Sequence, residues 1–138
     1  MDMKSAIVNV YTNYFGFTGR AARAEFWYFV LFTWIAYLLL SIVNSFFFGM
    51  NAADIDPANM DGMGMASLWG IGILGGLFWL ASVIPSIAVS IRRLHDIGRT
   101  GWWLLLIFVP LGGFVLLYFY IKPSQPGANQ YGPNPYGE

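Results

Sequence analysis

The side chains of this chain that are best suited to bind ions or transfer protons lie in the segment RRLHDIGRTGWW, residues 92–103. Three arginines, a histidine and an aspartate gather there, in a chain of which only 10% is charged. Residues three or four apart share one face of a helix, so Asp96 can pair with Arg92 or Arg93. Arginine binds carboxylates and phosphates through paired hydrogen bonds. The segment therefore predicts either an internal ion-pair network or a site for an anion.

A second group of charged residues lies earlier, in the segment FGFTGRAARAEFW, residues 15–27. Arg20, Arg23 and Trp27 recur at spacings of three and four, which places them on one helix face. Both segments contain Thr-Gly where a helix is expected to begin, so two positive helix N-termini would lie near the arginines. This favours an anion such as a lipid phosphate. The full candidate cluster consists of Arg20, Arg23, Glu25, Arg92, Arg93, His95, Asp96 and Arg99.

The acidic members of the cluster support a second interpretation. Glu25 and Asp96 can neutralise arginines in a buried network that fixes the helix ends without any ligand. Catalysis is not expected, because His95 and Asp96 are adjacent and point about 100° apart on a helix, so the carboxylate cannot easily orient the imidazole. We therefore predict that the protein is not an enzyme.

No cofactor or metal is expected either. One histidine with two acids has no recognised metal-ligand spacing, and the chain has no cysteine. Met60, Met63 and Met65 are soft thioether ligands of the kind that suits Cu(I), but they suit an apolar loop at the membrane surface equally. We favour the apolar loop.

Three apolar runs must position the charged segments. Residues 26–48, 66–91 and 102–121 contain no ionisable Asp, Glu, Lys, Arg or His, and 57% of the chain is hydrophobic. A helix of about 20 apolar residues crosses the hydrocarbon core of a bilayer. The sequence predicts an all-α membrane protein with transmembrane helices over residues 25–48, 66–91 and 102–121.

The third apolar run is interrupted by Pro110, Gly112 and Gly113, which leaves two possibilities. It crosses the membrane with a kink, or it enters and returns on one side. A re-entrant turn needs surrounding protein to satisfy its backbone, and this chain has few helices to supply it. We therefore expect a kinked crossing, with the tail on the opposite side from the 92–101 loop.

The two ends of the chain have different patterns. Residues 5–16 have apolar side chains at helical spacing, which predicts an amphipathic helix in the membrane interface. Residues 122–138 are rich in proline and glycine and predict a free tail that is disordered, extended or rich in turns. With the three transmembrane helices they make a single integral-membrane domain over residues 1–138.

The distribution of basic residues predicts the orientation. Basic residues precede the first span and occupy the 92–101 loop, whereas the 49–65 loop has aspartates and no base. Cytoplasmic loops carry the excess of Lys and Arg, so we expect the N-terminus and the 92–101 loop in the cytoplasm and the 49–65 loop outside. The expected aromatic anchors at the interface are Trp27, Trp102 and Trp103.

The segments FGFTGRAARAEFW, RRLHDIGRTGWW and PGANQYGPNP, in this order around three apolar runs, resemble the family of small bacterial inner-membrane proteins called domain of unknown function 805. The resemblance covers nearly the whole chain and implies a multi-spanning protein of the bacterial cytoplasmic membrane. It carries no established activity. The positions that match its motifs are Gly19, Arg20, Arg23, Glu25, Trp27, Arg92, Arg93, Leu94, His95, Asp96, Gly98, Gly101 and Trp102.

The sequence thus predicts an inner-membrane protein whose Arg/Glu/His/Asp cluster organises the helix ends and binds anionic lipid headgroups or a partner protein. The net charge of zero gives no attraction to nucleic acid. The alternative is a subunit of a small oligomeric transporter or channel. Gly72 and Gly76 are spaced for close helix contact, within one chain or between copies in a homo-oligomer.

Overall fold

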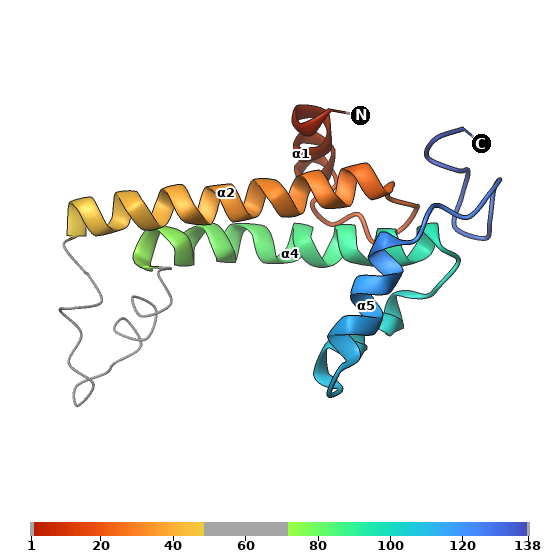
Figure 1. The fold of residues 1–138 in the computed structure, drawn as a ribbon. Coiled ribbons are helices and arrows are strands. Elements are labelled where there is room, and N and C mark those ends of the chain that lie inside the picture. Colours follow the sequence, from red (N-terminus) through yellow and green to blue (C-terminus); the bar gives the residue numbers. More distant parts are fainter. Residues whose placement is uncertain (1, 49–71, 138) are drawn as a thin grey trace. The chain divides into compact units, whose positions relative to one another are not determined.

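The structure, a computed structural model, describes residues 2–48 and 72–137 of the chain. Within these residues the fold is all-helical, as predicted, and its one bridge of β type, between Asn129 and Gly132, is isolated. The elements in chain order are α1 (Met3–Thr12), α2 (Arg23–Phe48), α4 (Gly72–Asp96), the 3₁₀ helix η3 (Gly101–Phe108) and α5 (Gly112–Ile121) (Figure 1).

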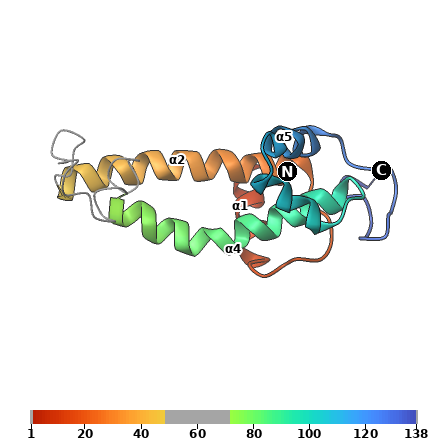
Figure 2. The same cartoon turned by 90° about the horizontal axis from the view of Figure 1, so that it is seen from below.

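Two helices are long and apolar enough to cross a bilayer, over residues Arg23–Asn44 of α2 and Leu74–Asp96 of α4. They correspond to the predicted spans 25–48 and 66–91, of which residues 66–71 lie outside the described part of the chain. Over the described part of residues 31–83, α2 and α4 lie side by side (Figures 1 and 2). The ring of Phe78 in α4 packs edge-on against Phe32 and Tyr37 in α2, with centroids 6.0 and 5.1 Å apart.

The described residues divide into two compact units, each of which is considered by itself. One unit contains the chain up to Val30 and from Ile84 onward, and the other contains the described part of Leu31–Val83. Every member of the candidate charge cluster belongs to the first unit. The predicted methionine loop and the whole 49–65 loop lie outside the described residues.

A kinked transmembrane helix was predicted over residues 102–121, but the structure divides this run into two separate helices, η3 and α5. Pro110 disfavours helical geometry in the residue before it, and Val109 is extended, with φ −92° and ψ 134°. Leu111 then adopts the left-handed conformation, with φ 64°. A Cβ at Gly112 would lie 1.8 Å from the carbonyl oxygen of Leu106, so only glycine fits this approach. The chain therefore reverses direction between the two helices.

The two arms formed by η3 and α5 pack against each other. Trp103 near the start of η3 meets Phe119 near the end of α5, with ring centroids 5.6 Å apart. Leu116 and Phe119 are buried together with Leu94 of α4, and Leu104 and Leu106 pack against them. We call residues 101–121 the apolar hairpin. Its base lies beside the end of α4, and its tip is the turn around Leu111.

The helix α1 occupies the region in which an interfacial helix over residues 5–16 was predicted. It begins after Asp2, whose carboxylate accepts a hydrogen bond from the backbone N–H of Ser5 at 2.8 Å. Ala6 and Val10 are buried. Its location in a membrane interface stays a prediction.

Candidate functional site

The charged residues of the 92–103 segment are positioned by the end of α4. The helix ends at Asp96, and Gly98 has the positive φ of 79° that a glycine stop allows. The backbone N–H of Arg99 donates to the carbonyl of Leu94 at 2.9 Å, which closes the last turn. The buried residues of this turn are Arg92, Arg93, Leu94, His95 and Asp96.

Asp96 is the centre of the network. Its carboxylate accepts from Arg20 Nε at 2.9 Å, from Arg93 Nη1, and from the Ser124 hydroxyl at 2.5 Å. The predicted pairing of Asp96 with an arginine on its own helix is confirmed for Arg93, three residues back. No side-chain atom of Asp96 is exposed to solvent, so the carboxylate relies on these donors in place of water.

Arg20 joins the network to the tail. In addition to the carboxylate of Asp96, its guanidinium donates to the carbonyl of the same residue at 3.2 Å. It also donates to the carbonyls of Gln125 at 2.7 Å, Gly127 at 2.8 Å and Gly132 at 3.3 Å. All three nitrogens of its guanidinium therefore have protein partners, and its side chain is 1% exposed.

Arg93 is buried and holds the end of α5. Besides pairing with Asp96, it donates to the carbonyls of Tyr120 at 3.3 Å and Lys122. The last carbonyls of a helix have no partner within the helix and carry partial negative charge, which basic side chains satisfy. Arg93 thus acts as a cap for α5, a contact that the spacing along α4 does not reveal.

Two further side chains from α2 satisfy the same helix end. Trp27 donates its indole N–H to Tyr120 at 3.1 Å, and Arg23 donates to Ile121 at 3.2 Å. Trp27 was predicted as an interface anchor, and Arg23 was predicted as an anion ligand. The structure shows both bound to backbone carbonyls of α5.

Arg92 makes a separate ion pair. Its Nη1 lies 2.9 Å from Glu25 Oε1, and both side chains are nearly buried, with 6% and 5% exposure. Nε and Nη2 of Arg92 have no hydrogen-bond partner among the described residues. The alternative pairing of Arg92 with Asp96 is not found, because Asp96 binds Arg20 and Arg93.

His95 contacts both the segment before α2 and the tail. Its Nδ1 lies 2.9 Å from the carbonyl of Gly19, and because a carbonyl only accepts, Nδ1 carries the proton. Its ring stacks on Tyr131 with a centroid distance of 3.9 Å and an angle of 3°. Asn129 donates to the carbonyl of His95 at 3.0 Å.

Arg99 and two of the predicted anchors lie apart from the buried network. The guanidinium carbon of Arg99 is 4.6 Å from the ring of Trp103 and 4.8 Å from that of Phe119. Trp102 is 79% exposed. The guanidinium of Arg99 makes no hydrogen bond or ion pair with any described residue, in contrast to those of Arg20 and Arg93.

The tail is the part of the site that the sequence analysis missed. A free tail, disordered, extended or rich in turns, was predicted, but the turns of residues 123–137 bind the end of α4. Gln125 donates its backbone N–H to the carbonyl of Asp96 at 2.9 Å, and Asn134 donates to Gln125 at 3.0 Å. The available signal was the segment PGANQYGPNP, whose Asn and Gly residues are typical of turns.

The comparisons agree with a helical membrane protein of this pattern. The chain belongs to the family described as "Protein of unknown function (DUF805)", which it matches over residues 14–133. This range includes both arginine segments and most of the tail. No solved structure matches the chain significantly.

Two relatives are similar over nearly their whole length. The chain is 35% identical over 129 residues to the inner membrane protein YhaH of Escherichia coli K12, covering 93% of both chains. It is equally 35% identical to the inner membrane protein YhaI of the same organism, covering 93% of this chain and 92% of YhaI. The uncharacterized protein YiiR is 33% identical over 95 residues, which cover 69% of this chain and 51% of YiiR.

Proposed function

We propose that this protein is an integral inner-membrane protein without enzymatic activity, whose buried charge network joins the helix ends to the tail and whose outer basic residues bind anionic lipid headgroups. One observation carries the proposal. The guanidinium donors of Arg20 and Arg93 are used by Asp96 and by backbone carbonyls. Arg99 is partly exposed, and its guanidinium donors are not used by any described residue.

The buried network supports an architectural role for its members. Arg20, Arg93 and Asp96 connect the segment before α2, the end of α4, the end of α5 and the tail. Removing one partner of a buried pair leaves an uncompensated charge, so the contacts depend on one another. A phosphate would have to displace Asp96 to reach Arg20 or Arg93, which makes these two residues poor lipid ligands.

The outer basic residues support headgroup binding. Arg99 lies over Trp103 and Phe119, and the Lys122 ammonium lies 5.6 Å from the centre of the Tyr118 ring. A cation over a ring face keeps its N–H donors available for a phosphate, and aromatic rings with basic residues are typical of the headgroup level. We therefore assign the lipid contacts to Arg99 and Lys122.

Arg23 adds a third candidate contact. It lines a polar pocket of about 300 Å³ with Pro123, Ser124 and Tyr136. The hydroxyl oxygen of Tyr136 accepts from the backbone N–H of Ala24 at 3.4 Å, which leaves its proton free to donate. The pocket has room for a headgroup phosphate beside the guanidinium of Arg23.

The proposed orientation places these residues in the cytoplasm. It rests on the predominance of basic residues in the first unit and on the aspartates of the 49–65 loop, which has no base. The relatives YhaH and YhaI are named inner membrane proteins, in agreement with an inner-membrane location for this chain. The transporter or channel alternative, which would need an oligomer, has no specific support among the described residues, because the charged side chains of α2 and α4 gather at one end.

Native mass spectrometry of the protein released from detergent, with phosphatidylglycerol and phosphatidylcholine in competition, tests the proposal. We expect the wild type to retain phosphatidylglycerol selectively, and Arg99→Gln or Lys122→Gln to lose this selectivity severalfold. Lys4→Gln is the matched control, because it removes the same charge from the exposed surface of α1. Equal retention of both lipids by the wild type, or an equal loss in Lys4→Gln, contradicts the proposal. The same spectra report whether the protein is monomeric or a homo-oligomer.

A further inference from the structure

The apolar hairpin leaves the end of α4 and returns to the same place. The backbone N–H of Gln125 lies 2.9 Å from the carbonyl oxygen of Asp96, the last residue of α4. One nitrogen of Arg20, Nη2, donates to the carbonyls of both residues, at 3.2 and 2.7 Å. These hydrogen bonds hold the two ends of the segment 97–124 next to each other.

The surface of the hairpin is apolar and exposed. The exposed fractions are 83% for Phe108, 76% for Leu111 and 71% for Phe114, all near the tip. An exposed apolar surface of this kind is typical of contact with a membrane or another apolar partner. Since the chain belongs to a family with inner-membrane relatives, the acyl chains of lipids are the partner that fits this surface.

The length of the hairpin decides how far it can reach. The 8 residues of η3 extend about 16 Å at the 3₁₀ rise, and the 10 residues of α5 extend about 15 Å at the α rise. The hydrocarbon core is about 30 Å thick. Each arm therefore reaches about halfway across, which matches one leaflet.

The turn at the tip pairs three of its backbone N–H groups locally. The N–H groups of Val109, Gly112 and Phe114 donate to carbonyls three residues earlier, at 3.0, 2.8 and 3.2 Å. Pro110 has no N–H. Because unpaired backbone donors are costly in hydrocarbon, these three bonds and the missing N–H of Pro110 leave fewer donors for surrounding protein to satisfy.

We propose that residues 101–121 form a re-entrant hairpin in the leaflet on the side of the 92–101 loop, so that the tail lies on that same side. The hairpin contacts phospholipid acyl chains and does not cross the membrane. Arg99 and Lys122 lie with Trp103 and Tyr118 at its base, as expected for residues at the headgroup level. This arrangement replaces the predicted kinked crossing and does not depend on lipid headgroup selectivity.

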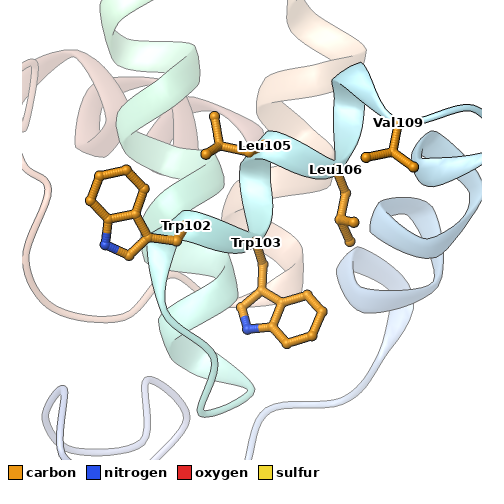
Figure 3. A pocket seen from close by; sticks show the side chains of 5 residues that line it. All are labelled: Trp102, Trp103, Leu105, Leu106 and Val109. Atoms are coloured by element: carbon orange, nitrogen blue, oxygen red, sulfur yellow. The ribbon is translucent and has the colours of Figure 1, made fainter.

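A shallow apolar groove gives the acyl chains a specific place to pack. Trp102, Trp103, Leu105, Leu106 and Val109 line it, and its volume is about 270 Å³. Figure 3 shows these side chains following one another along η3 from the base toward the tip. The groove is smaller than a typical site for a whole ligand, but an extended apolar chain entering along η3 fits it in part.

Labelling of single cysteines tests the topology, because the natural chain has no cysteine. Thr100→Cys reports the accessibility of the base of the hairpin, Phe108→Cys that of the tip, and Gln130→Cys that of the tail. All three positions are exposed. A membrane-impermeant maleimide is applied to inverted and to right-side-out vesicles. We expect Thr100→Cys and Gln130→Cys to react from the same side, and Phe108→Cys to give background labelling from both sides. Labelling of Thr100→Cys and Gln130→Cys from opposite sides overturns the proposal in favour of a crossing helix.

A depth measurement separates insertion from a hairpin folded on the membrane surface. A bimane probe on Phe108→Cys, in vesicles with doxyl groups at defined acyl positions, should be quenched most by the deepest label. A probe on Thr100→Cys should be quenched most by the shallowest label. Equal shallow quenching at both positions contradicts insertion. Phe114→Cys serves as a second tip position if Phe108→Cys folds poorly. These outcomes are independent of the lipid competition described above, so the two proposals can fail separately.

Discussion

Nε of Arg20 lies 2.9 Å from Oδ1 of Asp96, although 76 positions separate the two residues in the chain. Both side chains are excluded from solvent, with exposed fractions of 1% and 0%. The pair holds the segment before α2 against the end of α4. Because Arg20 also binds three carbonyls of the tail, one guanidinium links parts of the chain that are far apart in sequence.

Replacing Asp96 should destabilise the fold strongly. Asp96→Asn leaves Arg20 and Arg93 buried without a carboxylate, and breaking a buried pair in this way costs about 3–5 kcal/mol. The free energy of unfolding, followed in mixed micelles of rising denaturing-detergent content, measures the loss. Asp2→Asn is the control, since asparagine caps α1 as well as aspartate does. A similar small effect in both variants would show that the network contributes little.

Two adjacent glycines at the tip of the hairpin should respond differently to alanine. Gly112→Ala places a methyl group 1.8 Å from the carbonyl oxygen of Leu106, so the turn must open. Overpacking of this kind costs about 1–3 kcal/mol. Gly113→Ala meets nothing within 4 Å and should be neutral or slightly stabilising. Thermal unfolding of both variants in one detergent checks the difference, and equal melting temperatures would contradict the observed turn.

The stacking of Tyr131 on His95 should keep the tail in place. Tyr131→Ala removes a ring 3.9 Å from the imidazole, and aromatic pairs contribute about 0.5–1.5 kcal/mol beyond burial. Hydrogen exchange of backbone amides in residues 125–136 should become faster. Tyr131→Phe keeps the ring and should exchange like the wild type. Unchanged exchange in Tyr131→Ala would mean that the hydrogen bonds of the tail hold it in place without the Tyr131 ring.

Substituting Arg20 by lysine tests whether geometry or charge holds the tail. Arg20→Lys preserves the positive charge but loses the planar set of donors that reaches Asp96, Gln125 and Gly127 at once. We expect faster amide exchange in the tail and a lower melting temperature. Lys4→Arg, an exposed substitution in the opposite direction, should change neither. Full retention of tail protection in Arg20→Lys would assign the contact to charge alone.

The start of α1 should depend on pH. Hydrogen bonds from Ser5 hold the pKa of Asp2 below its ordinary value of 3.8. A lowered pKa in the folded state stabilises the helix above the ordinary pKa, and this contribution is lost as the pH falls through the lower value. Amide exchange near Ser5, corrected for its intrinsic pH dependence, should therefore show loosening only in acid. Asp2→Asn should show no such transition.

Several features could be predicted from the sequence because they depend on residues that are close together in the chain. The apolar runs predicted helices long enough to span a bilayer, since burial in lipid requires continuous apolar length. Gly98 in the segment RRLHDIGRTGWW is typical of a helix end, because glycine adopts a positive φ without steric cost. The pairing of Asp96 with Arg93 followed from helical spacing.

The remaining features depend on contacts between distant segments, which only the tertiary structure decides. Arg20 meets Asp96, and Arg92 meets Glu25, because helix ends come together in space. Pro110 and Gly112 marked a break in the third apolar run, but both a kinked crossing and a return were compatible with them. The return follows from the left-handed Leu111 and from the packing of Trp103 on Phe119, a pairing across the turn that residue types alone do not fix.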